Sequence, residues 1–441
     1  MKYNTVQIKK KIGEQAILTI AKESGFEMRQ PRKIDGVGFL IGFCMMMQFS
    51  LRGLSDWARA IGKFTGKHVS KQGLQKKLQF RQESFVRDLL MHVIKQSAKG
   101  KPKNIPLLDA FNKVYVEDST CLSLPKNLAK FYPGPHSKNE GQCATARVQL
   151  RINLKDNSYQ NIQVNSFRDN DQSFAHQILD VLEEGALVIR DQGYFVLSVF
   201  KKIIEKKAFF LSRLRFGTNV YDGQTGEKLD LLKLLGECKK EGKKVLDINV
   251  LLGSTDKIPV RLVAVEAPED VKRIRRFKAK NDRNGKANHS DEYFELLGWT
   301  IFITNVEAKV WGFRDIIRAY RCRWRIEIIF KCWKSSFNVD NFFDGKESIS
   351  PPRVIITIYM MLIWLTMTIS WYGIFVERVY EQTQKHLSII KFSEFIKRNF
   401  WEVLLAGKPD QFIEELARHD CYEKRKDRQS YLELLYMNFL S

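Results

Sequence analysis

The chain has 441 residues, which is enough for two or three domains with a substantial core. It carries 73 Lys and Arg against 50 Asp and Glu, so its formal net charge is +23 and a polyanionic partner, nucleic acid or an anionic membrane surface, is favoured. None of the seven cysteines forms a CxxC pair and none of the seven histidines an HxxxH pair, which argues against a zinc site and a disulfide framework.

Residues 1–105 are expected to form a helical and strongly basic N-terminal region. They carry 21 Lys and Arg against 7 Asp and Glu, a net charge of +14. The pattern predicts a helix near residues 51–63, a turn at Gly66 and a second helix capped by Ser70. Basic side chains follow this cap: Lys71, Lys76, Lys77 and Arg81. A helix-turn-helix of the kind that binds DNA has this form, and a generic helical hairpin with a basic surface fits the same residues.

Residues 106–214 are expected to form the first part of an α/β core. One strand ends near Asp118, two more are joined by a hairpin turn at Asp156-Asn157, and a short buried strand, 186–190, ends directly before Asp191. With the helices between them, the order is β-β-β-α-β-α-β. In such an order the first and fourth strands are usually neighbours, as in ribonuclease H. We therefore expect Asp118 and Asp191 to face each other.

Residues 215–298 are expected to form an inserted, largely β subdomain, because Gly-containing turns separate strand-like pieces. Near its end, residues 271–286 hold eight Lys or Arg against one Asp. The run begins with Lys272, Arg273, Arg275 and Arg276. We expect it to contact a polyanion, with a solvated surface as the alternative.

Residues 299–376 are expected to complete the core with a strand and a long helix. The helix carries Tyr320, Arg323, Glu327 and Lys334, at offsets of 0, 3, 7 and 14. At ~100° per residue these positions fall within about 60° of one another. An adjacent stripe is apolar: Cys322, Ile326, Ile329, Phe330 and Trp333. The sequence therefore predicts a helix with one buried side and one side that presents a phenol, a guanidinium, a carboxylate and an ammonium.

Residues 354–376 contain no charge, and these 23 residues are long enough to span a bilayer. A helix that is apolar all round can equally be buried inside a large domain. The hydroxyl groups in the segment and the lack of a second strong span favour the buried helix, so we expect no membrane contact. Residues 377–441 are expected to be helical and charged. The first residues lack the apolar core of a signal peptide, so we expect a cytoplasmic protein.

Three carboxylates, those of Asp118, Asp191 and Glu327, would form a site for Mg²⁺ or Mn²⁺ if they converge, because these ions prefer hard oxygen ligands. Two such ions about 4 Å apart can activate a water or hydroxyl and stabilise the leaving oxygen in an attack on a phosphodiester. Without a cation the carboxylates would repel one another. Turn or capping roles for the two aspartates are the alternative.

The spacing of Tyr320, Arg323, Glu327 and Lys334 resembles the Tyr-x2-Arg-x3-Glu-x6-Lys signature of DDE transposases of bacterial insertion sequences, the insertion sequence four type. Asp118 in EDST and Asp191 in IRDQGY match the two aspartates of that family. The resemblance covers roughly residues 50–375. Gln192 stands where the family commonly has Arg, which puts a phosphate contact at that position in doubt.

The resemblance implies an α/β fold with a ribonuclease H-like core that a β-rich insertion interrupts, flanked by a helical DNA-binding N-terminal region and a helical C-terminal region. It also implies that Asp118, Asp191 and Glu327 are the catalytic triad and hold two Mg²⁺ or Mn²⁺ ions. Tyr320, Arg323 and Lys334 would contact the DNA backbone at the cut; a surface pair that bridges Glu327 is the alternative for the two cations. Trp299 would stack on a base flipped out during hairpin formation, or else belong to the core.

The implied activity is cut-and-paste transposition: metal-dependent cleavage at the element ends through a hairpin, then strand transfer into target DNA. The implied partners are duplex DNA, as terminal inverted repeats and target, and a second copy of the chain in a homodimer, in the cytoplasm at the nucleoid. The basic N-terminal region would help to recognise the repeats, and residues 271–286 would hold the DNA backbone. Two alternatives stay open: a ribonuclease H-like nuclease without strand transfer, and a domesticated DNA-binding protein.

Overall fold

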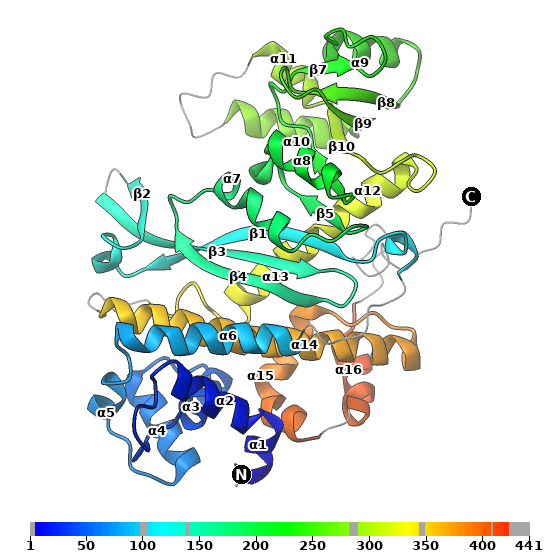
Figure 1. Cartoon of the computed structure of the whole chain (residues 1–441). Coiled ribbons are helices and arrows are strands. Elements are labelled where there is room, and N and C mark those ends of the chain that lie inside the picture. The colour runs from blue at the N-terminus through cyan, green and yellow to red at the C-terminus, as the bar shows by residue number, and fades with distance from the viewer. Residues whose placement is uncertain are drawn as a thin grey trace. The chain divides into compact units, whose positions relative to one another are not determined.

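The computed structural model describes residues 5–97, 105–137, 141–281, 290–343, 349–406 and 409–422 (Figure 1). The chain divides into two compact units. Unit 1 comprises the described residues of 1–103, 119–168 and 325–433, and unit 2 those of 104–118 and 169–324. One boundary falls inside strand β1 (Val114–Leu124), after Asp118, and another directly after Trp324.

Unit 2 is built on a mixed sheet whose strands follow the order β1-β5-β6-β10-β9-β8-β7. The bounds are β5 (Leu187–Arg190), β6 (Phe209–Arg213), β7 (Val220–Asp222), β8 (Val245–Leu252), β9 (Ile258–Glu266) and β10 (Trp299–Thr304). β1 runs parallel to β5, and β5 parallel to β6, whereas β10 is antiparallel to both β6 and β9. The predicted pairing of the first strand with the buried strand near 186–190 is confirmed.

Helices and apolar side chains cover this sheet. The helices are α7 (Asp171–Phe174), α8 (Leu197–Glu205), α9 (Leu231–Lys240), α10 (Glu269–Lys280), α11 (Asp291–Leu296) and α12 (Phe313–Cys322), with 3-10 turns at Pro106–Leu108, Ala175–Asp180 and Gln192–Tyr194. On α8, Val199, Phe200 and Ile203 are spaced at helical intervals, so they share one face and are buried in the core with the sheet.

The expectation of a largely β subdomain over residues 215–298 is wrong in composition. Among the residues described there, the helices α9, α10 and α11 hold more residues than the strands β7, β8 and β9. The strands also do not form a separate sheet, because every residue of β10 pairs with β9. The insertion therefore extends the sheet of unit 2.

Unit 1 is mainly helical. Its described helices are α1 (Thr5–Lys11), α2 (Glu14–Glu23), α3 (Gly36–Gln48), α4 (Leu54–Thr65), α5 (Lys71–Gln75), α6 (Glu83–Ser97), α13 (Trp324–Ser335, in this unit from Arg325), α14 (Pro351–Thr383), α15 (Ile389–Ala406) and α16 (Ile413–His419), with 3-10 turns at Phe80–Gln82, Lys126–Leu128 and Pro409–Phe412. Strand β3 (Gly141–Asn153) pairs antiparallel with β2 (Pro133–Ser137) and with β4 (Ser158–Ser166). The turn between β3 and β4 lies at Asp156-Asn157, as predicted, and Asn157 has a φ of 58°.

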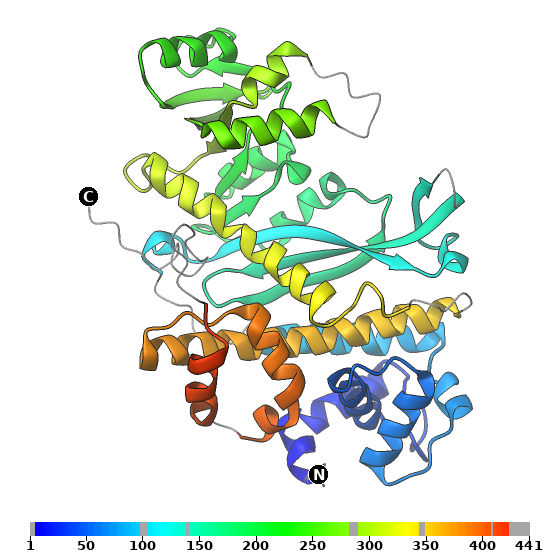
Figure 2. The ribbon, with the colours of Figure 1, turned by 180° about the vertical axis from the view of Figure 1, so that it is seen from behind.

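Helix α14 is the long apolar helix of unit 1. It lies beside α6, and both helices pack against β4 (Figures 1 and 2). Of the described helices it alone is long and apolar enough to cross a membrane, and 83% of its most apolar stretch is buried inside the protein. Its burial against β4 and its neighbouring helices supports the prediction of a core helix.

The predicted helix-turn-helix region has the expected turn but a shorter second helix. Gly66 ends α4 with a φ of 70°, and the Ser70 hydroxyl caps α5 by accepting a backbone N–H at 3.1 Å. Helix α5 has five residues and ends at Gln75. Lys76 and Lys77 therefore lie beyond its end.

Candidate active site

The register of β1 and β5 places the two aspartates opposite each other. Glu117 and Arg190 are paired across the two parallel strands, so the next residues, Asp118 and Asp191, are also neighbours. Adjacent strands lie about 5 Å apart, and successive side chains point to opposite faces. Asp191 keeps an extended backbone, with φ −80° and ψ 166°. Both carboxylates therefore leave the sheet on the face opposite to Glu117 and Arg190.

The expectation that a strand ends at Asp118 is corrected. Strand β1 continues to Leu124, so Asp118 lies inside a strand and the unit boundary follows it. β5 does end at Arg190, directly before Asp191. The two aspartates are therefore aligned because β5 stops beside the middle of β1.

A buried ion pair lies directly before the two aspartates, and the sequence analysis did not find it. Arg190 donates from Nε and Nη2 to Oε2 of Glu117, at 2.7 and 2.5 Å, and the two residues are 0% and 5% exposed. The Arg190 guanidinium also lies 5.4 Å from the ring centroid of Tyr194. The sequence does contain a signal for this pair. Glu117 and Arg190 lie in the otherwise apolar segments VYVED and LVIR, and buried charges are normally paired.

Two residues of the signature, Tyr320 on α12 and Arg323 directly after its end, contact the aspartates. The Tyr320 hydroxyl donates to Asp191 Oδ1 at 3.2 Å, and Arg323 Nη1 donates to Asp118 Oδ2 at 3.0 Å. Burial, and next the charge of Asp191, raise the pKa of Tyr320 well above its usual range, so the phenol keeps its proton and remains a donor. The Tyr320 ring packs on Phe302 of β10, with centroids 5.2 Å apart.

The predicted single helix is divided at Arg323. Helix α12 ends at Cys322 and α13 begins at Trp324. The apolar stripe is nevertheless buried as predicted, at 7% exposure or less for each member: Cys322, Ile326, Ile329, Phe330 and Trp333. Glu327 lies in the first turn of α13 and Lys334 in its last turn.

Glu327 and Lys334 belong to unit 1, whereas the two aspartates belong to unit 2. Lys334 donates to the Cys121 carbonyl at 3.0 Å and forms an ion pair with Asp340 at 3.3 Å. Among the described residues, no group of three His, Cys, Asp or Glu side chains stands ready to hold a metal ion. The closing of the triad by Glu327 therefore stays a prediction.

The carboxylate oxygens of Asp118 and Asp191 are nevertheless suitable ligands for a divalent cation. Two carboxylates on one face of adjacent strands offer hard oxygen ligands, which Mg²⁺ and Mn²⁺ prefer. Arg323 provides a positive charge beside Asp118, where two neighbouring carboxylates would otherwise repel. Gln192, the departure from the family pattern, donates to the Leu214 carbonyl at 2.6 Å and is thereby tied to the chain that follows β6.

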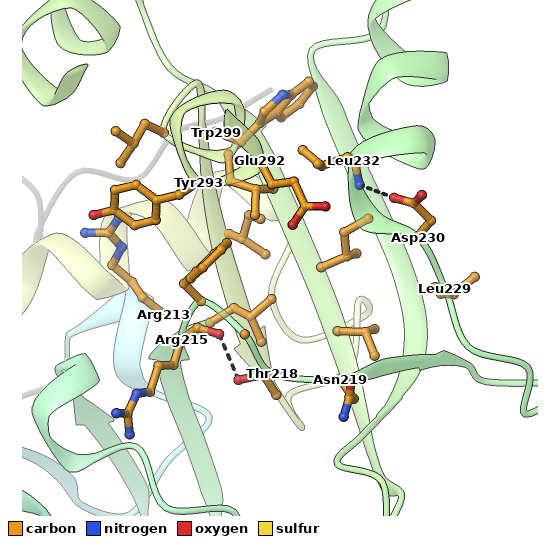
Figure 3. A pocket seen from close by; sticks show the side chains of 18 of the residues that line it. Arg213, Arg215, Thr218, Asn219, Leu229, Asp230, Leu232, Glu292, Tyr293 and Trp299 are labelled. Carbon is orange, nitrogen blue, oxygen red and sulfur yellow. Dashed lines mark hydrogen bonds between the residues drawn. The ribbon is translucent and has the colours of Figure 1, made fainter. Parts of the chain in front are cut away.

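A cavity of about 530 Å³ opens beside Trp299 in unit 2 (Figure 3). Trp299 begins β10, is 8% exposed and belongs to the apolar core, but it also lines the cavity. Arg213 and Tyr293 lie around the same space (Figure 3). Arg275 lines it too, and its guanidinium donates to the Trp299 carbonyl at 3.1 Å. The tryptophan is therefore both a core residue and part of a cavity wall.

The basic residues selected at the start of the 271–286 run have different surroundings on α10. Lys272 is buried and paired with Glu266 and Glu269, at 2.7 and 2.6 Å. Arg276 lies 3.4 Å from a carboxylate oxygen of Glu295, and Arg275 donates to neighbouring backbone. Arg273 is exposed. Residues 282–286 lie outside the described residues.

The basic residues near α5 also differ. The Lys77 ammonium donates to the Phe26 carbonyl at 2.6 Å and lies 4.1 Å from the centroid of the Phe26 ring. Burial lowers the pKa of Lys77. Lys71, Lys76 and Arg81 are exposed. Lys77 is therefore engaged in a contact within unit 1, while the other three present their charge at the surface.

Comparison with known proteins identifies relatives of the chain. The profile of the family described as Transposase DDE domain matches residues 109–343. The chain is 27% identical to the transposase for insertion sequence element IS231B of Bacillus thuringiensis subsp. berliner, over 74% of this chain and 72% of that protein. It is 26% identical to the transposase for IS231E of Bacillus thuringiensis subsp. finitimus, over 80% and 76% of the two chains. The transposase for IS1151 of Clostridium perfringens is 24% identical, over 77% and 75%.

Among solved structures, a chain of the cryo-EM structure of the piggyBac transposase synaptic complex with hairpin DNA aligns at 9% identity and a TM-score of 0.47, over 97% of this chain and 87% of that chain. A likeness of this size is too weak to carry an argument. The family match is sufficient by itself, because it includes Asp118, Asp191 and Glu327 and spans more than half of the chain. The chain belongs to the DDE transposase family and is a DNA transposase.

Proposed function

We propose that the protein performs cut-and-paste transposition, with Asp118, Asp191 and Glu327 as its catalytic carboxylates. The pairing of β1 with β5 is the observation that carries this proposal, because it puts the first two carboxylates on one face of adjacent strands. Divalent ions bound there would lower the pKa of the attacking water or 3′-hydroxyl and neutralise charge on the scissile phosphate. Glu327 would complete the ligand set from α13.

The signature residues would orient the carboxylates and hold the DNA. Tyr320 fixes the rotation of the Asp191 carboxylate through its hydrogen bond, and we propose that it also contacts the backbone at the cut. Arg323 carries a guanidinium next to Asp118, and such a planar donor binds two phosphate oxygens well. We propose that Arg323 contacts the phosphates beside the cut.

Lys334 is proposed to contact the DNA backbone near the cut from the end of α13. Its ammonium is held by Cys121 and Asp340 and is about one-third exposed, so it is both oriented and accessible. We expect Lys334→Ala to reduce cleavage about tenfold or more, since one charge-assisted contact contributes about 1.5–3 kcal/mol. Gel-based nicking assays at several DNA concentrations would measure this. Lys331→Ala, an exposed lysine of the same helix, is the matched control, and equal cleavage by the two variants would remove the proposed role.

Trp299 is proposed to stack on an extruded base, because it forms part of the wall of a cavity that three arginines also line. Stacking on a base contributes about 1–3 kcal/mol. We expect Trp299→Ala to slow hairpin formation by about fivefold to a hundredfold more than it slows the first nick. Time courses that separate nicked, hairpin and fully cut DNA would show this difference.

Trp299→Phe is the control for that variant, because it keeps a stacking ring and much of the core volume. We expect Trp299→Phe to retain most of the wild-type rate of hairpin formation. Thermal unfolding of both variants measures how much of the loss in activity comes from weaker packing in the core. An equal loss in the first nick and in hairpin formation would assign Trp299 to the core alone.

The DNA partners are proposed to be the terminal inverted repeats of the element and a target duplex, bound by a homodimer. The net charge of +23 and the exposed Lys71, Lys76 and Arg81 support binding to phosphates. The deciding experiment incubates the purified protein with Mg²⁺ and a duplex from the flanks of its own gene. Nicks and hairpins at the element end are expected. Transfer of a pre-cut end into plasmid would then separate a transposase that joins strands from a nuclease that only cuts.

A further inference from the structure

Helix α10 divides its basic residues between two faces. Six of its twelve residues are Lys or Arg. Those on the inner face are engaged within unit 2: Lys272 with two glutamates, Arg275 with the backbone of Leu297 and Trp299, and Arg276 with Glu295. These contacts fix the helix against the sheet and leave the opposite face outward.

The outward face combines cations with large apolar side chains. Ile274 and Phe277 are 50% and 67% exposed. Within the part of the chain that the structure describes, the side chains of Arg273, Lys278 and Lys280 make no hydrogen bond or ion pair. The contrast with the inner face is complete, because all three inner cations have partners there.

The cationic and apolar side chains of the outward face follow a defined order around the helix. At ~100° per residue, Lys280 and Arg273 lie at one edge of an arc of about 160°, and Lys278 lies at the other edge. Phe277 and Ile274 lie between them. Asp270, in the first turn of the helix, lies in the same arc, so the apolar centre of this face begins at Ile274. An apolar centre with a cation on each side is complementary to a groove of duplex DNA, in which a phosphate wall stands on each side of the base edges.

We propose that this outward face of α10 enters the major groove of duplex DNA, with Phe277 and Ile274 against thymine methyl groups. The proposal rests on the transposase function proposed above. A helix with its side chains is about 10–12 Å wide, and the major groove is about 12 Å wide, so the two fit. The thymine methyl is the apolar group displayed in that groove. Arg273 and Lys280 would contact one phosphate wall, and Lys278 the other.

The test is binding of the full chain, without divalent metal, to a duplex from the flanks of its gene, followed by fluorescence anisotropy. Phe277→Ala is expected to weaken binding about tenfold, as for the loss of one good base contact, without a change in the salt dependence. Ile274→Ala is expected to act in the same direction. Lys278→Ala should instead lower the slope of affinity against salt by about 1. Val181→Ala, another exposed apolar residue of unit 2, is the matched control and should bind as the wild type does.

A second duplex contains deoxyuridine in place of thymine, which removes only the methyl groups. The wild type is expected to bind it several-fold more weakly, whereas Phe277→Ala should bind both duplexes equally. Equal binding of the two duplexes by the wild type, or Phe277→Ala behaving as Val181→Ala does, would overturn the proposal. So would a Phe277→Ala variant that lost only self-association in sedimentation, or only binding to phosphatidylserine vesicles.

The failure of this inference is distinguishable from the failure of the proposed function. Metal-dependent nicking by the wild type tests the function, whichever surface of the duplex α10 contacts. If the wild type nicks the duplex but is insensitive to the thymine methyls, the function stands and only the placement of α10 falls.

Discussion

Asp118→Ala and Asp191→Ala are each expected to reduce cleavage by about three orders of magnitude or more. A divalent ion at a phosphodiester contributes several kcal/mol of transition-state stabilisation, and each 1.36 kcal/mol is a factor of ten in rate. Loss of either aspartate removes a ligand from the pair that β1 and β5 align. Binding to the element end is expected to be largely retained, because the proposed phosphate contacts come from other residues.

The measurement pairs a nicking assay in Mg²⁺ with a binding assay on the same duplex. Asp180→Ala, which changes an exposed aspartate of unit 2, is the matched control and should leave cleavage unchanged. Full cleavage by Asp118→Ala or Asp191→Ala would contradict the assignment of that carboxylate. If binding were lost together with cleavage, the variant would report on DNA contact and not on the reaction.

Glu327→Ala tests the third member separately, because Glu327 lies in the other unit. We expect it to abolish cleavage with binding largely intact, as for the two aspartates. Cleavage at the wild-type rate would show that another group completes the site. The aspartate pair would then stand without Glu327.

Features that depend on a few neighbouring residues were predicted from the sequence in both units. The apolar run that ends at Arg190 predicted a buried strand, and the order of elements predicted its pairing with β1. The Asp156-Asn157 turn and the Ser70 cap were predicted because short polar side chains bond to nearby backbone in a recognisable pattern. Such signals need only a few residues.

Other features depend on tertiary contacts and escaped the sequence. No Gly or Pro in the sequence indicates that the signature helix is divided at Arg323. The extension of β1 beyond Asp118 and the continuation of the sheet into the insertion both depend on pairing with distant strands. Lys272 and Arg273 are neighbours in one basic run, yet one is buried in ion pairs and the other is exposed. Charge alone does not distinguish their roles.

The pair of Glu117 and Arg190 was missed for a related reason. Glu117 directly precedes Asp118 and Arg190 directly precedes Asp191, and only the two aspartates match the family pattern. The structure shows that strand alternation separates the two pairs of residues: the aspartates leave one face of the sheet, and the ion pair is buried on the other. Its position suits it to hold the register of β1 and β5.

Arg190→Met is expected to destabilise unit 2 by about 3–5 kcal/mol, because it removes the guanidinium that pairs with the buried Glu117 carboxylate. That is a large share of the roughly 5–15 kcal/mol by which a domain is stable. Urea unfolding at neutral pH would measure the loss as a lower midpoint. Lys113→Ala is the matched control, because it breaks the exposed pair with Glu183, which contributes at most about 1 kcal/mol.

The double variant Glu117→Leu/Arg190→Met separates charge burial from register. Two apolar side chains can replace a buried ion pair at little cost, so we expect the double variant to regain most of the stability lost by Arg190→Met. The hydrogen bonds from Arg190 to Glu117, which link β5 to β1 through side chains, would still be absent. If the pair positions Asp118 and Asp191, cleavage at saturating DNA should stay below that of the wild type while the midpoint recovers. Recovery of both would limit the pair to a structural role, and recovery of neither would show that the site cannot repack.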